Sequence, residues 1–192
     1  MASADVEQRE RPRQANIYLG MLLFLLSEAF LFGALFWSYF DLRGNNFPHW
    51  PPEGVHLGLL LVSINTAILL ASSGAMQWAI VAIRRGSRGG LIGGLLATML
   101  LGSTFLVIKG WEWATVPFRP WSHAYGSIFY TMTGFHALHV LAGILILLAL
   151  LLRARRHRFS AERHLAVEVG GLYWHFVDLV WLFVFTSIYL IQ

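Results

Sequence analysis

The sequence contains no cysteine and few charged residues. Without a thiol, the chain cannot form a disulfide, an iron–sulfur cluster, a thiolate metal site or a cysteine nucleophile. Asp, Glu, Lys and Arg together make up 12% of its 192 residues, whereas soluble domains carry roughly 25%. Hydrophobic residues make up 57%. These proportions exclude an ordinary soluble domain and predict an integral membrane protein.

Long hydrophobic runs fill the space between the few charges. Five runs reach the roughly 20 residues that a helix needs to cross a ~30 Å hydrocarbon core: 17–40, 56–83, 91–110, 125–152 and 168–190. The first run is too long for a secretory signal peptide, and no small-residue cleavage site follows it. We expect an all-α fold, with one bundle of five transmembrane helices over residues 16–192 and a loose, polar, cytoplasmic tail over 1–15.

The basic residues predict the orientation of these spans. One side of the membrane receives Arg9, Arg11, Arg13, Arg84, Arg85, Arg88, Arg153, Arg155, Arg156, Arg158 and Arg163. The other side receives Arg43, Lys109 and Arg119. Because cytoplasmic loops carry an excess of Lys and Arg, we expect the N-terminus in the cytoplasm and the C-terminus outside. A net charge of +4 distributed in this way does not indicate a nucleic-acid partner.

Glu28 is the one charged residue of the first run. A helical rise of about 1.5 Å per residue places it roughly 16 Å from either end of the run, close to the middle of the bilayer. An acidic residue there costs about 2.5 to 3.5 kcal/mol, so it usually faces protein or water and is usually functional. The alternative is a carboxyl group that is hydrogen-bonded for packing alone.

The last two runs carry the other polar candidates. His136 and His139 are three residues apart and therefore share a helix face. Glu168, His175 and Asp178 recur at helical spacing and also share a face. Asp178 lies one turn from His175, close enough in sequence to fix its tautomer. The remaining histidines, His56, His123, His157 and His164, are expected at helix ends or in loops.

These polar residues allow three interpretations. Histidine is the commonest metal ligand, so haem or metal ligation is one. A relay of Glu and His groups for protons is the second. Buried polar contacts that hold helices together, each worth about 0.6 kcal/mol, are the third. Haem ligation is disfavoured because two histidines on different spans should meet at one depth, and His136 and His139 share a helix. No hydrolase, nucleotide-binding or metalloprotease motif is present, so no catalytic, cofactor-binding or metal residue is predicted.

Several motifs follow one another in a recognisable order. They are Ser27-Glu28 with Phe36-Trp37, Asn65-Thr66 with Ser72-Ser73, KGWEW at 109–113, Tyr125-Gly126-Ser127, TGFHALHVLAG at 133–143 and EVGGLYWHFVDLVWLFVF at 168–185. In this order they resemble subunit III of the haem–copper oxidases, the family that includes cytochrome c oxidase subunit III. The resemblance covers about residues 15–192, and its last two motifs are long and specific.

The resemblance implies a role without a catalytic centre in this chain. Subunit III of this family binds no haem or copper, packs on subunit I, which holds them, and supports proton uptake and stability during turnover. It also holds phospholipids in a cleft. The matching polar positions here are Glu28, His136, His139, Glu168, His175 and Asp178. The long family form has seven spans, with the lipid cleft between the first two and the other five, and this chain resembles only the last five, a short bacterial form. The cleft is therefore not expected here, and the place left for bound phospholipid is between this bundle and a neighbouring subunit.

We therefore predict a non-catalytic subunit III of a proton-pumping terminal oxidase in a bacterial cytoplasmic membrane. Subunits I and II and other respiratory-complex subunits are the expected partners, and oxygen is reduced to water by the complex. Within the family, the alternatives are a quinol oxidase subunit or an accessory subunit of a nitric oxide reductase. An independent transporter or a haem-binding module is the alternative from another class. A transporter usually shows inverted repeats and broken spans, and the sequence shows neither.

Overall fold

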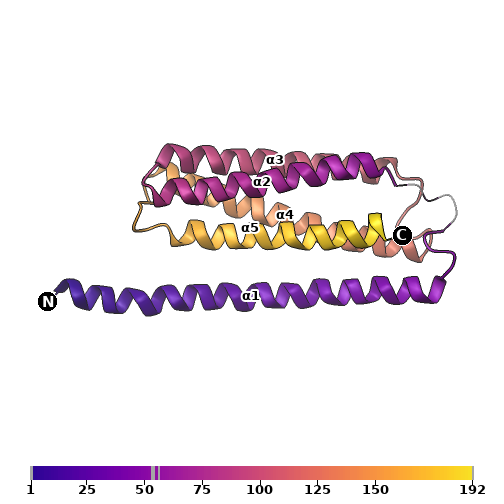
Figure 1. Cartoon of the computed structure of the whole chain (residues 1–192), viewed down its shortest axis with the longest axis horizontal. Helices are drawn as coiled ribbons and strands as arrows, with labels where there is room; N and C mark the ends of the chain where they lie inside the picture. Colours follow the sequence, from indigo (N-terminus) through magenta and orange to yellow (C-terminus); the bar gives the residue numbers. More distant parts are fainter. Residues whose placement is uncertain (1, 53–54, 56, 192) are drawn as a thin grey trace.

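The computed structural model describes residues 2–52, 55 and 57–191, with side chains from residue 14 onward. The described elements are helical (Figure 1): α1 (Ala2–Asn46), α2 (Leu59–Arg84), α3 (Arg88–Thr115), α4 (Ala124–Arg155), α5 (Leu165–Phe185) and the π-helical turn η1 (Thr186–Leu190). Each of the five long helices is long and apolar enough to cross a membrane. The predicted all-α bundle of five spans is confirmed.

α1, α3 and α4 extend further than their hydrophobic runs predict, and polar caps determine where α3 and α4 begin. The Ser87 hydroxyl accepts a hydrogen bond from the Gly90 backbone N–H, so α3 begins at Arg88. His123 Nδ1 accepts one from the Gly126 N–H, so α4 begins at Ala124. The prediction of a loose tail over residues 1–15 is wrong in one respect, because α1 already begins at Ala2. The segment before the second span, including His56, lies outside the described residues.

The five helices run antiparallel in sequence order, and α1 lies along one side of a bundle formed by the other four (Figure 1). The start of α1, the α2–α3 turn and the α4–α5 connection share one end, which we call the basic end because it holds most of the arginines. The α1–α2 and α3–α4 connections and the end of α5 share the opposite end, which we call the loop end. α1 contacts α4 and α5, and α5 also contacts α2 and α4.

Small residues bring α3 close to α2 and α5. A Cβ atom built on Gly94 would lie 2.6 Å from the Ala79 Cβ, so nothing larger than glycine fits at this crossing. The side chain of Trp174 on α5 is enclosed by two glycines in a similar way. A Cβ on Gly102 would lie 2.6 Å from Trp174 Cη2, and one on Gly143 would lie 2.8 Å from Cε3. Trp174 is therefore fixed between α3 and α4.

α1 attaches to the bundle through a single seam with a seven-residue repeat. Its least exposed side chains are Tyr18, Leu25, Phe32 and Tyr39, with Met21, Glu28, Leu35 and Leu42 at the intervening positions, and Phe36 and Arg43 beside them. This is the a/d pattern of two helices packed side by side. Glu28 is the one acidic residue in an otherwise apolar or tyrosine-bearing seam. Glu28 faces protein because it lies in this seam. The sequence analysis expects the same from the depth of Glu28 in the bilayer.

Candidate functional site

Glu28 of α1 pairs with His139 of α4. Glu28 Oε2 lies 2.8 Å from His139 Nε2, and the two side chains are 20% and 15% exposed. His139 Nδ1 lies 2.7 Å from the Phe135 carbonyl oxygen. A carbonyl only accepts, so Nδ1 carries a hydrogen, and the contact at Nε2 needs one further proton shared with Glu28. The pair therefore holds one exchangeable proton and has no net charge, whichever partner carries that proton.

Two more polar contacts hold α1 near its ends. At the basic end the Tyr18 hydroxyl donates to the Glu168 carboxylate of α5. At the loop end the Tyr39 hydroxyl donates to the Ser187 carbonyl, at 2.6 Å. That carbonyl belongs to η1, the π-helical turn that follows α5. With the Glu28–His139 pair, α1 is held to the bundle by a polar contact near each end and one in the middle.

Glu168 is the centre of a polar cluster at the basic end. Its Oε1 accepts hydrogen bonds from Arg84 Nη2 at 2.6 Å and Nε at 2.9 Å, and it lies 3.1 Å from His164 Nε2. The cluster joins α1, α2 and α5 where the helices reach the membrane boundary. In the adjacent α4–α5 connection, the Ser160 hydroxyl donates to the exposed Glu162 carboxylate and lowers the pKa of Glu162.

His136 lies apart from His139 although the two share a helix face. It is fully buried, with its ring 5.6 Å from that of Phe105 and 4.8 Å from that of Trp181. Neither of its ring nitrogens has a hydrogen-bond partner among the residues that the structure describes. His136 therefore faces α3 and α5, whereas His139 faces α1. The two histidines do not form one site.

Asp178 does not orient His175, contrary to the sequence-based expectation. His175 Nδ1 instead lies 2.6 Å from the Ser73 hydroxyl of α2. The buried carboxylate of Asp178 lies close to the same Ser73 hydroxyl. Glu168, in contrast, belongs to the separate cluster at the basic end.

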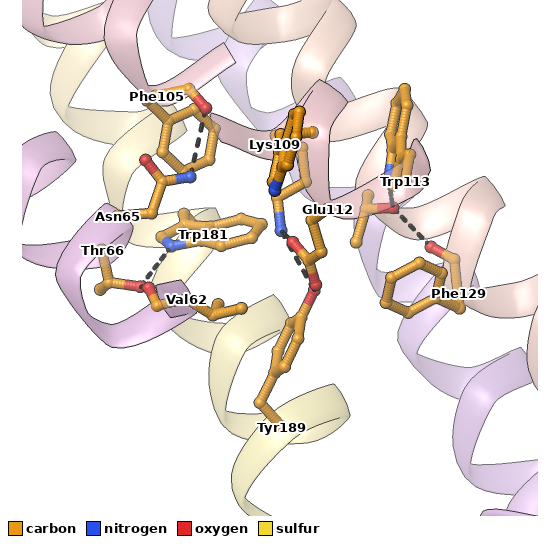
Figure 2. Close-up of polar contacts among 12 residues, drawn as sticks. Val62, Asn65, Thr66, Phe105, Lys109, Glu112, Trp113, Phe129, Trp181 and Tyr189 are labelled. Atoms are coloured by element: carbon orange, nitrogen blue, oxygen red, sulfur yellow. Dashed lines mark hydrogen bonds and ion pairs between the residues drawn. The ribbon is translucent and has the colours of Figure 1, made fainter. Parts of the chain in front are cut away.

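The polar residues of α2 serve mainly to position the tryptophans of α5. The Trp174 indole N–H donates to the Ser72 hydroxyl and the Trp181 indole N–H donates to the Thr66 hydroxyl, each at 3.0 Å. The Asn65 side-chain amide donates to the Phe105 carbonyl of α3 (Figure 2). These contacts explain why hydroxyl and amide side chains occur inside a transmembrane helix, since a buried indole N–H needs an acceptor.

A buried ion pair near the loop end was missed by sequence analysis, which counted Lys109 only among the charges on the outer side. Lys109 Nζ lies 2.5 Å from Glu112 Oε2, and the two side chains are 1% and 6% exposed. The Tyr189 hydroxyl donates to Glu112 Oε1 at 2.7 Å (Figure 2). Lys109 Nζ also lies 4.4 Å from the centre of the Trp181 ring. The signal for this cluster is an i, i+3 Lys/Glu pair inside KGWEW, flanked by tryptophans.

The polar side chains of the bundle make their contacts in separate places. Among residues 14–191 that the structure describes, no three His, Cys, Asp or Glu side chains gather where they could hold a metal ion. The two histidines of α4, His136 and His139, face different helices. The Glu28–His139 pair joins α1 to α4, and the Lys109–Glu112–Tyr189 cluster joins α3 to η1, so each links elements that are distant in the sequence.

Comparison with known proteins gives a consistent result. The family model described as cytochrome c oxidase subunit III matches residues 7–192. A protein of Thermostichus vulcanus named cytochrome c oxidase subunit 3 is 39% identical over 174 residues, which cover 90% of this chain and 86% of that protein. Proteins of the same name from Gadus morhua and Salmo salar are 40% identical over 184 residues, which cover 93% of this chain and 70% of theirs.

Proposed function

Since this chain belongs to the cytochrome c oxidase subunit III family, we propose that it serves its oxidase without a catalytic centre of its own. In this proposal it packs on subunit I beside subunit II, and those subunits hold the haems and copper. It supports proton uptake and the stability of the complex while oxygen is reduced to water. The family match favours an oxidase of the cytochrome c type over the quinol oxidase, nitric oxide reductase, transporter and haem-module alternatives.

The observation that carries this proposal is the use of the polar groups within the spans. Glu28 bonds His139 and Glu168 bonds Arg84 and Tyr18 across helix contacts, and Lys109 bonds Glu112 within α3, so these ionisable side chains largely neutralise one another. A group that ligates a cofactor would instead direct several such side chains at one point. The arrangement supports a scaffold that holds its own helices in register and can exchange protons at Glu28.

The chain is a multi-pass membrane protein, and we propose the bacterial cytoplasmic membrane as its location, with the basic end in the cytoplasm. The arginines of the α2–α3 turn and the α4–α5 connection support this orientation, because positive loops stay on the cytoplasmic side. The exposed tryptophans Trp37, Trp111 and Trp121 lie toward the loop end and Trp78 lies toward the basic end, as expected for aromatic belts at both membrane interfaces.

A groove at the basic end supports the binding of an anionic phospholipid. It has a volume of about 700 Å³ and lies between α1, α4 and α5, with Ile17, Met21, Ile146 and Leu150 among its apolar wall residues and Arg153, Arg158 and Arg163 at its rim. Apolar walls suit acyl chains, and clustered arginines suit a phosphate group. The groove does not need the two spans that the long family form has in addition.

Purification through a tag on this chain tests the proposal. We expect the tagged chain to bring down a larger subunit that carries haem, and the absorption spectrum of the preparation to show a Soret band that follows the larger subunit when the two are separated. A Soret band that stays with this chain, or purification of this chain without any haem-bearing partner, would contradict the proposal.

A further inference from the structure

The α4 helix ends in the same hydrogen-bonding motif as α2, but with a different residue at the turn. After α2, the Gly86 N–H donates to the Ile83 carbonyl at 2.9 Å, and the N–H of the next residue donates to the Ala82 carbonyl at 2.8 Å. Gly86 has a φ of 74°, the left-handed conformation in which this motif usually places glycine. The equivalent residue after α4 is His157, with a φ of 55°.

Histidine gives the backbone no advantage at this position. The His157 N–H donates to the Ala154 carbonyl at 3.2 Å, and the N–H of Arg158 donates to the Arg153 carbonyl at 3.1 Å. Glycine would make the same bonds without the steric cost that a Cβ atom has at positive φ. His157 is the one non-glycine residue with a positive φ in the part of the chain that the structure describes. Its side chain therefore has to account for its place in the motif.

That side chain contacts Arg88, the first residue of α3. Arg88 Nη1 lies 2.6 Å from His157 Nε2. Arg88 Nε also donates to the Ala154 carbonyl at 2.9 Å, and Nη2 donates to the Arg155 carbonyl. These carbonyls are among the last four of α4, which have no partner within the helical ladder. Arg88 is half-buried and makes three contacts, so its guanidinium has a fixed position at the end of α4.

The contact defines the protonation state of His157. A guanidinium only donates, so His157 Nε2 accepts, and the imidazole is neutral with its hydrogen on Nδ1. A second proton, on Nε2, would remove the acceptor and place two cations in contact. Histidine side chains change charge between about pH 5 and 8. The contact is therefore present at the upper end of this range and is lost as the pH falls through it.

The charged groups nearest to His157 add to this repulsion. His157 lines a cavity of about 430 Å³ together with Arg153, Arg158 and Arg163. The Ser160 hydroxyl donates to Glu162 and lowers the pKa of that carboxyl group, so Glu162 keeps its charge while histidine titrates. The other charged or titratable groups on the adjoining elements are Arg84, Arg85, Arg155, Arg156, His164 and Glu168, of which the last two contact each other.

We propose that Arg88 and His157 form a pH-sensitive latch, which holds the α4–α5 connection to the start of α3 at neutral pH and releases it on acidification. The connection carries Arg158 and Arg163 at the rim of the basic-end groove, so release also frees these two arginines. The connection lies at the same end as the α2–α3 turn (Figure 1), and the proposed orientation places that end in the cytoplasm. The latch depends only on contacts within this chain, so its failure would leave the proposed function intact.

The mobility of a nitroxide label in the intact oxidase tests the latch, and this chain has no cysteine of its own to compete for the label. The label is attached at Ala161→Cys, within the connection, or at Arg85→Cys in the α2–α3 turn as the matched control. The complex with the unmodified chain gives the background from other subunits. We expect the label at position 161 to move several-fold faster at about pH 5.5 than at about pH 7.5, and the label at position 85 to move equally at both. No change at position 161, or an equal change at position 85, would overturn the proposal.

Two substitutions at His157 assign the change in mobility to this residue. His157→Gln keeps an acceptor for Arg88 at every pH, whereas His157→Lys keeps a cation there at every pH. Both carry a Cβ atom, so the backbone cost is matched. We expect the label at position 161 to move slowly at both pH values in the Gln variant and rapidly at both in the Lys variant. A pH response that persists in either variant would assign it to another group, such as His164, and would overturn the latch.

Discussion

Glu28 of α1 and His139 of α4 share one proton across a helix contact, with Oε2 and Nε2 2.8 Å apart. The pair lies in the middle of the seam of α1, which repeats every seven residues and whose neighbouring positions are apolar or aromatic. A polar pair at a seam position favours one register, because any slip leaves both groups in an apolar contact. The carboxylate thus combines a structural role with the capacity to hold a proton.

Removing the Glu28–His139 contact should loosen α1. We expect Glu28→Leu to lower the free energy of unfolding by about 1 to 2 kcal/mol, the upper range for a hydrogen bond between transmembrane helices. Glu28→Gln should cost less, because its amide can still donate to His139 Nε2. Denaturation of the solubilised chain with sodium dodecyl sulfate, followed by circular dichroism, measures the difference.

Ser27→Ala is the matched control for that series, because the Ser27 hydroxyl is exposed and bonds only the Phe24 carbonyl of its own helix. It should leave the transition almost unchanged. A Glu28→Leu variant as stable as Ser27→Ala would show that the contact does not hold α1.

Enlarging either glycine beside Trp174 should strain the bundle. We expect Gly102→Ala and Gly143→Ala each to lower the free energy of unfolding by about 1 to 3 kcal/mol, the usual range for overpacking. Gly110→Ala is the control, because a Cβ there meets nothing within 4 Å, and it should be neutral or slightly stabilising. The same denaturation measurement applies. A loss at Gly110→Ala equal to that at Gly102→Ala would point to a general need for glycine in α3 instead.

Replacing one partner of the buried ion pair should lower the free energy of unfolding more than replacing both partners. Lys109→Met leaves the Glu112 carboxylate buried without its cation, and such a change costs about 3 to 5 kcal/mol. We expect the double variant Lys109→Met with Glu112→Leu to recover part of that loss. The comparison requires a double-mutant cycle on thermal unfolding of the solubilised chain. Strictly additive losses would show that the two residues act independently.

The rim of the basic-end groove should determine how much anionic lipid the chain retains. We expect the double variant Arg153→Gln with Arg163→Gln to purify with less phosphatidylglycerol or cardiolipin than the unmodified protein, because two cations that face a phosphate are removed. Arg85→Gln, in the α2–α3 turn away from this groove, is the control. Mass spectrometry of the extracted lipids measures the amounts. Equal losses in both variants would indicate a general charge effect and no specific site.

The sequence predicts the five spans well, because a run of about 20 apolar residues has few other uses. It also predicts that Glu28 faces protein. It cannot predict which residue meets Glu28, because His136 and His139 are equally plausible by spacing, and only the packing of α1 against α4 selects His139. For the same reason the sequence pairs Asp178 with His175, whereas the structure pairs His175 with Ser73 from a different helix.

Lys109 shows a different limit of sequence analysis. A lysine close to the end of an apolar run is normally assigned to the membrane surface, and hydropathy alone cannot distinguish it from a buried one. The distinction depends on Glu112 one turn away and on Tyr189, which is 80 residues later in the chain. The fold was thus predictable from local patterns, whereas the polar contacts depend on which helices become neighbours.

The central claim is that this chain sustains oxidase turnover without holding the reacting metals, and oxygen consumption by the complex with and without the chain tests it most directly. We predict that depletion of the chain leaves the haem spectrum intact while oxygen consumption declines much sooner during continuous turnover, and that adding the chain back restores the longer time course. Loss of haem together with the chain, or identical time courses with and without it, would contradict the account.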